Sequence, residues 1–221
     1  MELHLPHWHN PHIGEYRWPV SAIAAIVVYL QVQLSEQFAM PAKVPVFTLE
    51  VILLLGLFIS NPKRIVKHHL PTRAFGFGLT TLMTISNTVS AIKLIHTLIF
   101  GGIENATTLL IAGGSIYLTN VVVFALWYWD LDRGGPGARA EARNPHPDFL
   151  FPQMSDPRYA PKNWHPRFYD YLYISITNAS AFSPTDAMPL SRWAKLLMTI
   201  QSLTSLLTVG LVIARAVNIL K

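Results

Sequence analysis

Four polar residues near the end of the chain recur at helical spacing inside an apolar stretch. Residues 190–221 are long and periodic enough to span a membrane, and steps of one, three or four residues separate Gln201, Thr204, Ser205 and Thr208. In a helix these side chains share one face, and a polar face in a lipid-spanning helix must meet water or protein. Two interpretations stay open: the face lines a pore, or it makes hydrogen bonds to neighbouring helices.

Glu50 and Lys93 are ionisable residues inside two other apolar stretches, residues 46–60 and 79–100. Counting the stretches places both residues near the same membrane face, at depths of about 6 and 10 Å for a rise of about 1.5 Å per residue. Because an intramembrane charge is costly without a partner, we expect an ion pair between them. A transport role is the second interpretation, and a Lys93 side chain that reaches the membrane surface is the third.

The N-terminal segment carries four histidines, His4, His7, His9 and His12. Imidazole nitrogens suit zinc, copper or nickel, but the spacing matches no defined metal site. We therefore expect neither a metal nor a cofactor; such a segment titrates with pH or touches lipid headgroups. Cysteine is absent, and no GxSxG, HExxH, Walker or Rossmann pattern occurs. The sequence thus predicts that the protein is not an enzyme.

These residues belong to a very apolar chain. Of 221 residues 51% are hydrophobic and 13% are charged, whereas soluble domains carry about 25% charged residues. The net charge is +5, but the basic residues fall mainly at the ends of apolar stretches and in loops, which indicates contact with lipid and not with nucleic acid. We predict an all-α integral membrane protein of a bacterial plasma membrane, with the lipid bilayer as its first partner.

The apolar stretches are each near the length of about 20 residues that crosses a hydrocarbon core, and they predict about five transmembrane helices. Small residues in the fourth stretch, Gly113, Gly114 and Ser115, let helices approach closely. Repeated prolines break residues 130–166, and their aromatic residues indicate an ordered cap. The expected parts are a His-rich segment at 1–18, a three-helix bundle at 19–106 with spans at 20–39, 46–60 and 79–100, a fourth span at 107–129, the cap at 130–166, a short helix at 167–179 and a last span at 190–221.

The segment from residue 170 reads DYLYISITNASAFSPTDAMPL and leads into the last apolar stretch. A short aromatic-led helix is followed by a loop that Asp186 closes, and Pro189 stands three residues later. This pattern resembles the pore-loop module of tetrameric potassium channels, over about the last quarter of the chain. The resemblance implies that residues 107–221 are a pore-like module of a homotetramer, with an outer helix at 107–129, a pore helix at 167–179, a filter-like loop at 180–189 and an inner helix at 190–221.

The filter-like loop departs from the family pattern. Ser183 and Thr185 stand where the family has glycines and would be strained at positive φ, and Pro184 stands where it has tyrosine. Stacked carbonyl rings that replace the water around potassium are therefore not expected. The site residues of the loop are Ser180, Ala181, Phe182, Ser183, Pro184, Thr185 and Asp186.

Two functions follow from this loop. Its hydroxyl and carboxylate oxygens predict weakly selective permeation of monovalent cations through an oligomeric pore. The alternative is a non-conducting scaffold or partner subunit, in which the loop packs against its neighbours and Asp186 caps a helix or accepts a hydrogen bond.

The charges give conflicting signals about orientation. Counting five spans places the N-terminus, the basic residues 63–73 and the cap on one face, and the turn at Lys43 with the C-terminus on the other. The positive-inside rule then puts the cap in the cytoplasm, whereas the filter entrance of the resembling family faces outward.

Overall fold

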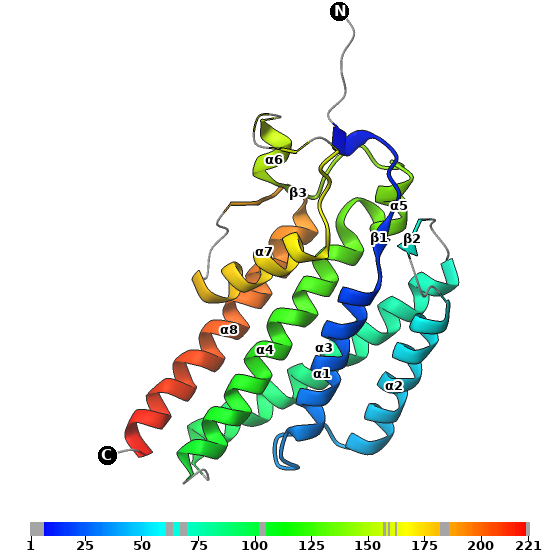
Figure 1. Cartoon of the computed structure of the whole chain (residues 1–221). Coiled ribbons are helices and arrows are strands. Elements are labelled where there is room, and N and C mark those ends of the chain that lie inside the picture. Colours follow the sequence, from blue (N-terminus) through cyan, green and yellow to red (C-terminus); the bar gives the residue numbers. More distant parts are fainter. Residues whose placement is uncertain are drawn as a thin grey trace, which may run out of the picture.

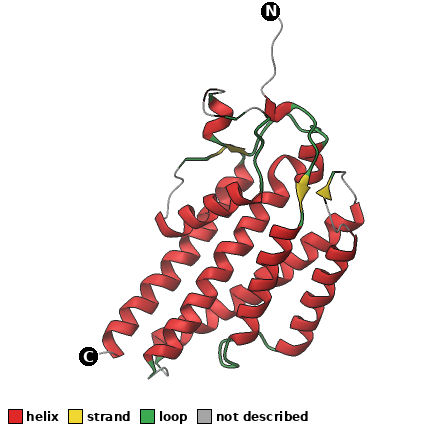
Figure 2. Cartoon of the chain, viewed as in Figure 1, coloured by secondary structure: helices red, strands yellow, loops and turns green. Residues whose placement is uncertain are grey.

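The computed structural model describes residues 7–60, 64–66, 70–101, 105–156, 158, 160–161, 163–181 and 186–219. In this part the chain is helical apart from two short antiparallel strand pairs (Figure 2). The helices of the bundle are α1 (Trp18–Gln33), α2 (Lys43–Ser60), α3 (Leu70–Phe100), α4 (Ala106–Leu131), α7 (Phe168–Ala181) and α8 (Arg192–Ile219). The shorter elements are η1 (His7–His9), β1 (Glu15–Tyr16), β2 (Arg64–Ile65), η2 (Asp132–Gly134), α5 (Pro136–Ala140), β3 (Phe149–Leu150), α6 (Pro152–Ser155) and β4 (Met188–Pro189).

Three helical segments of the described chain are long and apolar enough to cross a membrane. They are Thr72–Phe100, Ala106–Gly134 and Arg192–Ile219, so the structure supports an integral membrane protein with an all-helical fold. The expected number of about five spans is not confirmed by length and composition.

The first expected span is shorter than predicted. Helix α1 has 16 residues, or about 24 Å at about 1.5 Å per residue, which is less than the hydrocarbon thickness of about 30 Å. It ends at Gln33 because the polar run Ser35, Glu36 and Gln37 follows. The chain then turns back, and Phe38 and Ala39 enter the core beside α3 and α4. The prediction had extended the helix through this turn to residue 39.

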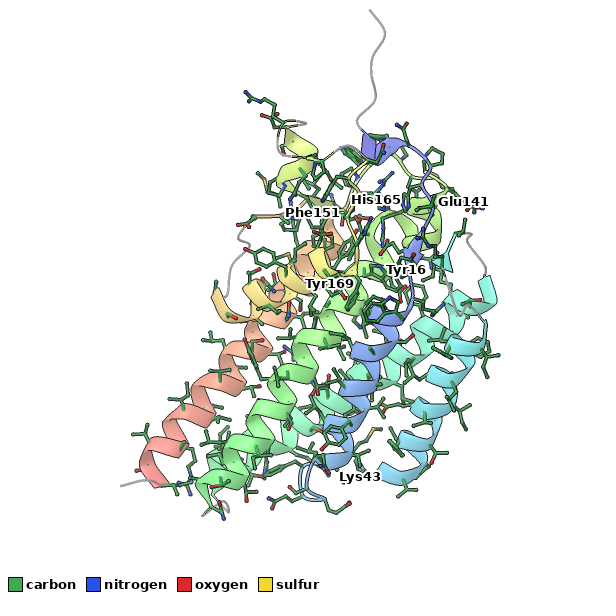
Figure 3. The ribbon with its side chains drawn as sticks, in the orientation of Figure 1. Tyr16, Lys43, Glu141, Phe151, His165 and Tyr169 are labelled. Atoms are coloured by element: carbon green, nitrogen blue, oxygen red, sulfur yellow. The ribbon has the colours of Figure 1, made fainter. Side chains whose placement is uncertain are left out.

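The bundle has two distinct ends (Figure 1). At one end β1 pairs with β2 and β3 pairs with β4, and the cap elements α5 and α6 lie there too. The connection between α1 and α2, the end of α3, the start of α4 and the end of α8 lie at the other end. Figure 3 shows the same division, with Lys43 far from Glu141, Phe151 and His165. The described segments at each end are those that the sequence placed on one face, although the number of five spans is not confirmed.

The cap is held by aromatic packing. Phe149 is fully buried, with its ring centroid 5.1 Å from that of Tyr128 on α4 and 5.7 Å from that of Trp193 on α8. Phe151 meets Trp164 and Tyr171 edge to face at centroid distances of 5.9 and 5.5 Å. These contacts make the proline-rich segment part of the main hydrophobic core and join it to the ends of α4, α7 and α8.

Helix α7 has 14 residues and packs against α4 and α8. The chain begins α7 next to the cap at Phe168, and it is back at the cap by β4, where Phe149 and Pro189 pair. The backbone N–H of Leu190 donates to the carbonyl of Asp148 at 2.8 Å. The short helix and the segment after it therefore start and end at the same end of the bundle.

Candidate functional site

The polar face of α8 is turned toward helices of its own chain. The side chain of Gln201 is fully buried. Its Oε1 accepts hydrogen bonds from the Tyr128 hydroxyl at 2.6 Å and from Asn178 Nδ2 at 2.8 Å. Its Nε2 donates to Ser175 Oγ at 2.6 Å and to the Ser175 carbonyl at 3.0 Å. All hydrogen-bonding capacity of this amide is directed at α4 and α7.

The same cluster anchors α7. Ser175 Oγ donates to the carbonyl of Val121 on α4 at 2.5 Å. Asn178 Nδ2 donates to the carbonyl of Met198 at 3.0 Å, and Ser202 Oγ donates to Asn178 Oδ1 at 3.1 Å. In an apolar surrounding each of these groups needs such a partner, so the cluster joins α7 to both long helices.

The remaining polar residues of α8 continue along the same groove. Ser205 is buried and its Oγ accepts from Asn120 Nδ2 on α4 at 3.0 Å. Thr208 is also buried, and its Oγ1 has no partner among the described residues. Thr204 is half-buried and borders a cavity of about 200 Å³ between α3, α4 and α8. The face expected to line a pore thus follows the second interpretation, hydrogen bonding between helices, for Gln201 and Ser205.

The filter-like loop lies only partly in the described chain. Residues Phe182, Ser183, Pro184 and Thr185 lie outside it. Ser180 Oγ donates to the carbonyl of Ile176 at 2.7 Å and lies 3.2 Å from the Tyr117 hydroxyl, and Ala181 ends α7. Asp186 is exposed, and its Oδ2 accepts from the Tyr173 hydroxyl at 3.0 Å. The carboxylate that would attract cations is therefore tied to the preceding helix.

Glu50 and Lys93 do not meet. Lys93 Nζ donates to the carbonyl of Ala39 at 2.6 Å, and none of the ion pairs in the described chain joins the two residues. Lys93 bonds to this turn and not to Glu50, because the turn after α1 has carbonyl groups without helical partners. Glu50 is fully buried and lies against the amide of Gln31, which also contacts the hydroxyl of Ser86.

The N-terminal histidines are placed in the cap, except for His4, which lies outside the described residues. His7 begins η1, and the ring of His9 lies 3.8 Å from that of Trp8. His12 stacks on His165 at a centroid distance of 3.8 Å and an angle of 16°. In the described part of the chain no three histidine or acidic side chains gather where a metal ion could be held.

A buried ion pair connects the N-terminal segment to the cap. Arg139 NH2 lies 2.9 Å from Glu15 Oε1, and the two side chains are only 1% and 3% exposed. The other oxygen of Glu15 accepts from Trp129 Nε1 at 2.8 Å. Arg139 NH1 donates to the carbonyls of Trp129 and Asp132 at 2.6 and 3.0 Å, so this one side chain joins β1, α5 and the end of α4.

Asp132 extends this network toward α7. Its Oδ2 accepts from the Tyr171 hydroxyl at 2.5 Å, and its Oδ1 accepts from the backbone N–H of Asp148 at 2.9 Å. Asp148 in turn accepts from Trp193 Nε1 at 2.9 Å and from the backbone N–H of Arg133 at 2.9 Å. Glu15 and Arg139 are ion-paired, and the carboxylates of Asp132 and Asp148 are hydrogen-bonded, which is the arrangement of a structural junction between the cap and the bundle.

This junction was not predicted from the sequence. Glu15 and Arg139 are separated by 124 residues, and no local pattern relates them. The one local signal is the pair Asp130 and Asp132 directly after the apolar stretch of α4, since carboxylates at such a place need partners.

Comparison of the chain with models of protein families, with curated proteins and with solved structures found no match to any of them. The geometry of its own residues is therefore the basis for a functional proposal.

Proposed function

We propose that the chain is a non-conducting subunit of a membrane assembly, with a channel-like helical arrangement that serves packing. The observation that carries this proposal is the position of Gln201, which is fully buried and hydrogen-bonded to α4 and α7. A water-filled path along α8 needs polar groups that face it. Here the amide of Gln201 makes its hydrogen bonds within the chain.

The free face of α8 is apolar. Leu196, Leu203, Leu207 and Val217 share it and are 53–60% exposed, and Gly210 on the same face has open space around it. In lipid, helices associate through close packing around small residues. We infer that this face packs on a second copy of the chain, in line with the homotetramer that the resemblance implies.

The absence of cysteine allows a direct test of this face. Leu203→Cys in membranes under oxidising conditions is expected to give disulfide-linked dimers, because only cysteines with Cα atoms within about 7 Å can be bridged. Met198→Cys is the matched control, since Met198 is buried inside the chain. Equal cross-linking of both variants, or none along the whole free face, would contradict self-association.

Ion flux tests the absence of conduction. Purified protein in liposomes loaded with a potassium-sensitive or sodium-sensitive dye is expected to give no cation flux above empty liposomes. A steady flux that scales with the amount of protein would overturn the proposal.

A weakly selective cation channel is the second candidate. It is favoured by the course of α7, which leaves the cap, packs between α4 and α8 and is followed by a return to the cap at β4. In this case Asp186→Asn should lower cation flux, because a ring of carboxylates attracts cations, whereas Asp156→Asn in the cap should not. Unchanged flux in Asp186→Asn would leave only the hydrogen bond from Tyr173 as the role of this residue.

A further inference from the structure

The carboxyl group of Glu50 lies inside the bundle without a cationic partner. Its side chain is fully buried at the eighth position of α2, and it takes part in none of the ion pairs of the described chain. A carboxylate in an apolar surrounding is costly unless it is paired, and it lowers this cost by binding a proton. Such a group marks a functional site by default.

The partners of Glu50 are neutral and suit both of its protonation states. With the nitrogen of the Gln31 amide turned toward α2, that nitrogen lies 3.0 and 3.1 Å from the two carboxylate oxygens and 3.0 Å from Ser86 Oγ. In this orientation the amide nitrogen donates hydrogen bonds to the carboxylate. With the amide turned by half a rotation its oxygen faces the same group and accepts from a protonated carboxyl. One amide rotation therefore accommodates the gain or loss of a proton.

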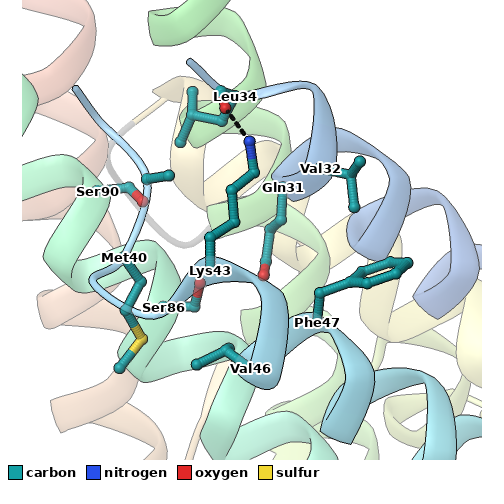
Figure 4. A pocket seen from close by; sticks show the side chains of 10 residues that line it. Gln31, Val32, Leu34, Met40, Lys43, Val46, Phe47, Ser86 and Ser90 are labelled. Carbon is teal, nitrogen blue, oxygen red and sulfur yellow. Dashed lines mark hydrogen bonds between the residues drawn. The ribbon is translucent and has the colours of Figure 1, made fainter. Parts of the chain in front are cut away.

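A small cavity lies next to this site, toward the end of the bundle that carries Lys43 (Figure 4). Its volume is about 20 Å³, and Gln31, Ser86 and Ser90 line it together with Leu34 and Lys43. A cavity above about 10–15 Å³ that offers polar partners can hold one water molecule. Such a water would link the Lys43 end of the bundle to Gln31 and Ser86, and through the Gln31 amide to the buried carboxyl.

The charged groups around the cavity are held by other partners. Lys43 Nζ donates to the carbonyl of Leu34 at 2.7 Å and lies 3.3 Å from the exposed carboxylate of Glu36. Lys93 Nζ on α3 donates to the carbonyl of Ala39 at 2.6 Å. Both ammonium groups are thus hydrogen-bonded to the turn after α1. Neither of them forms an ion pair with the carboxylate of Glu50 in the described chain.

We propose that Glu50, Gln31 and Ser86 form a reversible proton-binding site that exchanges protons through the cavity at the Lys43 end of the bundle. A hydronium ion in the cavity gives a proton to one carboxylate oxygen: an O–H bond of the ion breaks, an O–H bond of the acid forms and water is left, and the neutral acid donates to the turned Gln31 amide. Release reverses these steps and leaves the carboxylate bonded to the amide nitrogen. The site lies in α1, α2 and α3, and it is independent of the pore-like part of the chain.

Infrared spectroscopy of the protein in lipid tests the proposal without any variant. A titration between about pH 5 and pH 9 is expected to show the carbonyl band of a protonated carboxyl, which disappears as pH rises because the carboxylate does not have this band. Glu50→Gln, which keeps the side-chain size, should remove this band. Glu36→Gln is the matched control because Glu36 is 84% exposed, and it should leave the band in place.

Chemical labelling gives an independent measurement. Dicyclohexylcarbodiimide, an apolar reagent for protonated carboxyl groups, should modify Glu50 in membranes more slowly as pH rises, with Glu36 unmodified. Gln31→Leu should move the pH midpoint of labelling, because it removes the amide that contacts the carboxyl in both forms. A Glu50 that is unlabelled at every pH, a band that survives Glu50→Gln, or protection by sodium ions at constant pH would overturn the proton assignment.

Discussion

The hydroxyl of Tyr128 on α4 donates a hydrogen bond to Oε1 of Gln201 on α8 at 2.6 Å. Both side chains are fully buried, and they stand at the centre of the contact between α4, α7 and α8. Because the same oxygen also accepts from Asn178, one amide connects three helices. The loss of this amide should therefore weaken the packing of all three helices.

Gln201→Leu should lower the free energy of unfolding by roughly 1–3 kcal/mol, because the buried Tyr128 hydroxyl loses its acceptor and the hydrogen bonds to Asn178 and Ser175 are lost. Tyr128→Phe should cost less, about 0.5–1.5 kcal/mol, since Gln201 keeps its other bonds. Unfolding in mixed detergent micelles measures both values. Ile200→Val, at the neighbouring exposed position, is the control with an expected change below about 0.5 kcal/mol. Equal stability of Gln201→Leu and the control would show that the cluster does not hold α7.

The sequence predicts correctly those features of the structure that depend on residues close together in the chain. The long apolar runs predicted the helices that became α3, α4 and α8, because a run of this length has few other ways to satisfy its backbone in lipid. The ends were less certain: the polar residues Ser35 to Gln37 end α1, although the apolar pattern on both sides suggested continuity.

The side-chain partners were harder to predict. The periodicity of Gln201 and Ser205 gave their common face but not the direction of that face, which depends on how α4 and α7 pack. Glu50 and Lys93 were expected to pair from their depth alone. Depth does not include the rotation of each helix or the free carbonyl of Ala39, which Lys93 reaches instead. The ion pair of Glu15 and Arg139 depends on contacts across 124 residues, which one sequence does not encode in any local pattern.

Arg139→Met should destabilise the protein strongly. Arg139 and Glu15 are 1% and 3% exposed, and the removal of one partner of such a pair costs about 3–5 kcal/mol because the other charge stays buried. The double variant Glu15→Leu/Arg139→Met should be more stable than Arg139→Met alone, since no unpaired charge is left. Arg143→Met is the control: Arg143 is 55% exposed in its ion pair with Glu141, and a pair that is open to water should contribute less than about 1 kcal/mol. A double variant that is weaker than the single one would contradict this account.

Acid should loosen the junction of the N-terminal segment and the cap. Burial, with the nearby His165 and three arginines, lowers the pKa of His12 to about 3, and burial also lowers the pKa of His165. Below about pH 6.5 the unfolded chain binds a proton at His12 that the folded chain does not bind until about pH 3. Stability is therefore fully present above about pH 6.5 and falls as pH drops through this window.

The measurement is the unfolding midpoint between about pH 8 and pH 4, the range in which histidine titrates. His12→Asn should flatten the profile, because asparagine does not titrate and its oxygen can replace Nδ1 as acceptor for the N–H of Gly14. His146→Asn, at an exposed position of the cap, should leave the profile unchanged. A wild-type profile that is flat through this window would rule out the buried neutral histidine.

Gly113 and Gly114 give a matched pair for the close approach of α4 and α8. A Cβ added at Gly113 would lie 2.7 Å from Cγ2 of Val212, whereas a Cβ at Gly114 would meet nothing within 4 Å. Alanine improves helix propensity by about 1 kcal/mol at either position. Gly114→Ala should therefore be neutral or stabilising in unfolding measurements.

Gly113→Ala should instead lower stability, because the overpacked contact costs about 1–3 kcal/mol and exceeds the gain in propensity. The cause can be isolated with Val212→Ala, which removes both methyl groups that the new Cβ would strike. In that background the added Gly113→Ala should be neutral or stabilising. The double variant should therefore lose less stability than the sum of the two single variants, because the clash is removed. Identical effects of Gly113→Ala in both backgrounds would mean that α4 and α8 separate easily at this point, and that the helix approach is not set by Gly113.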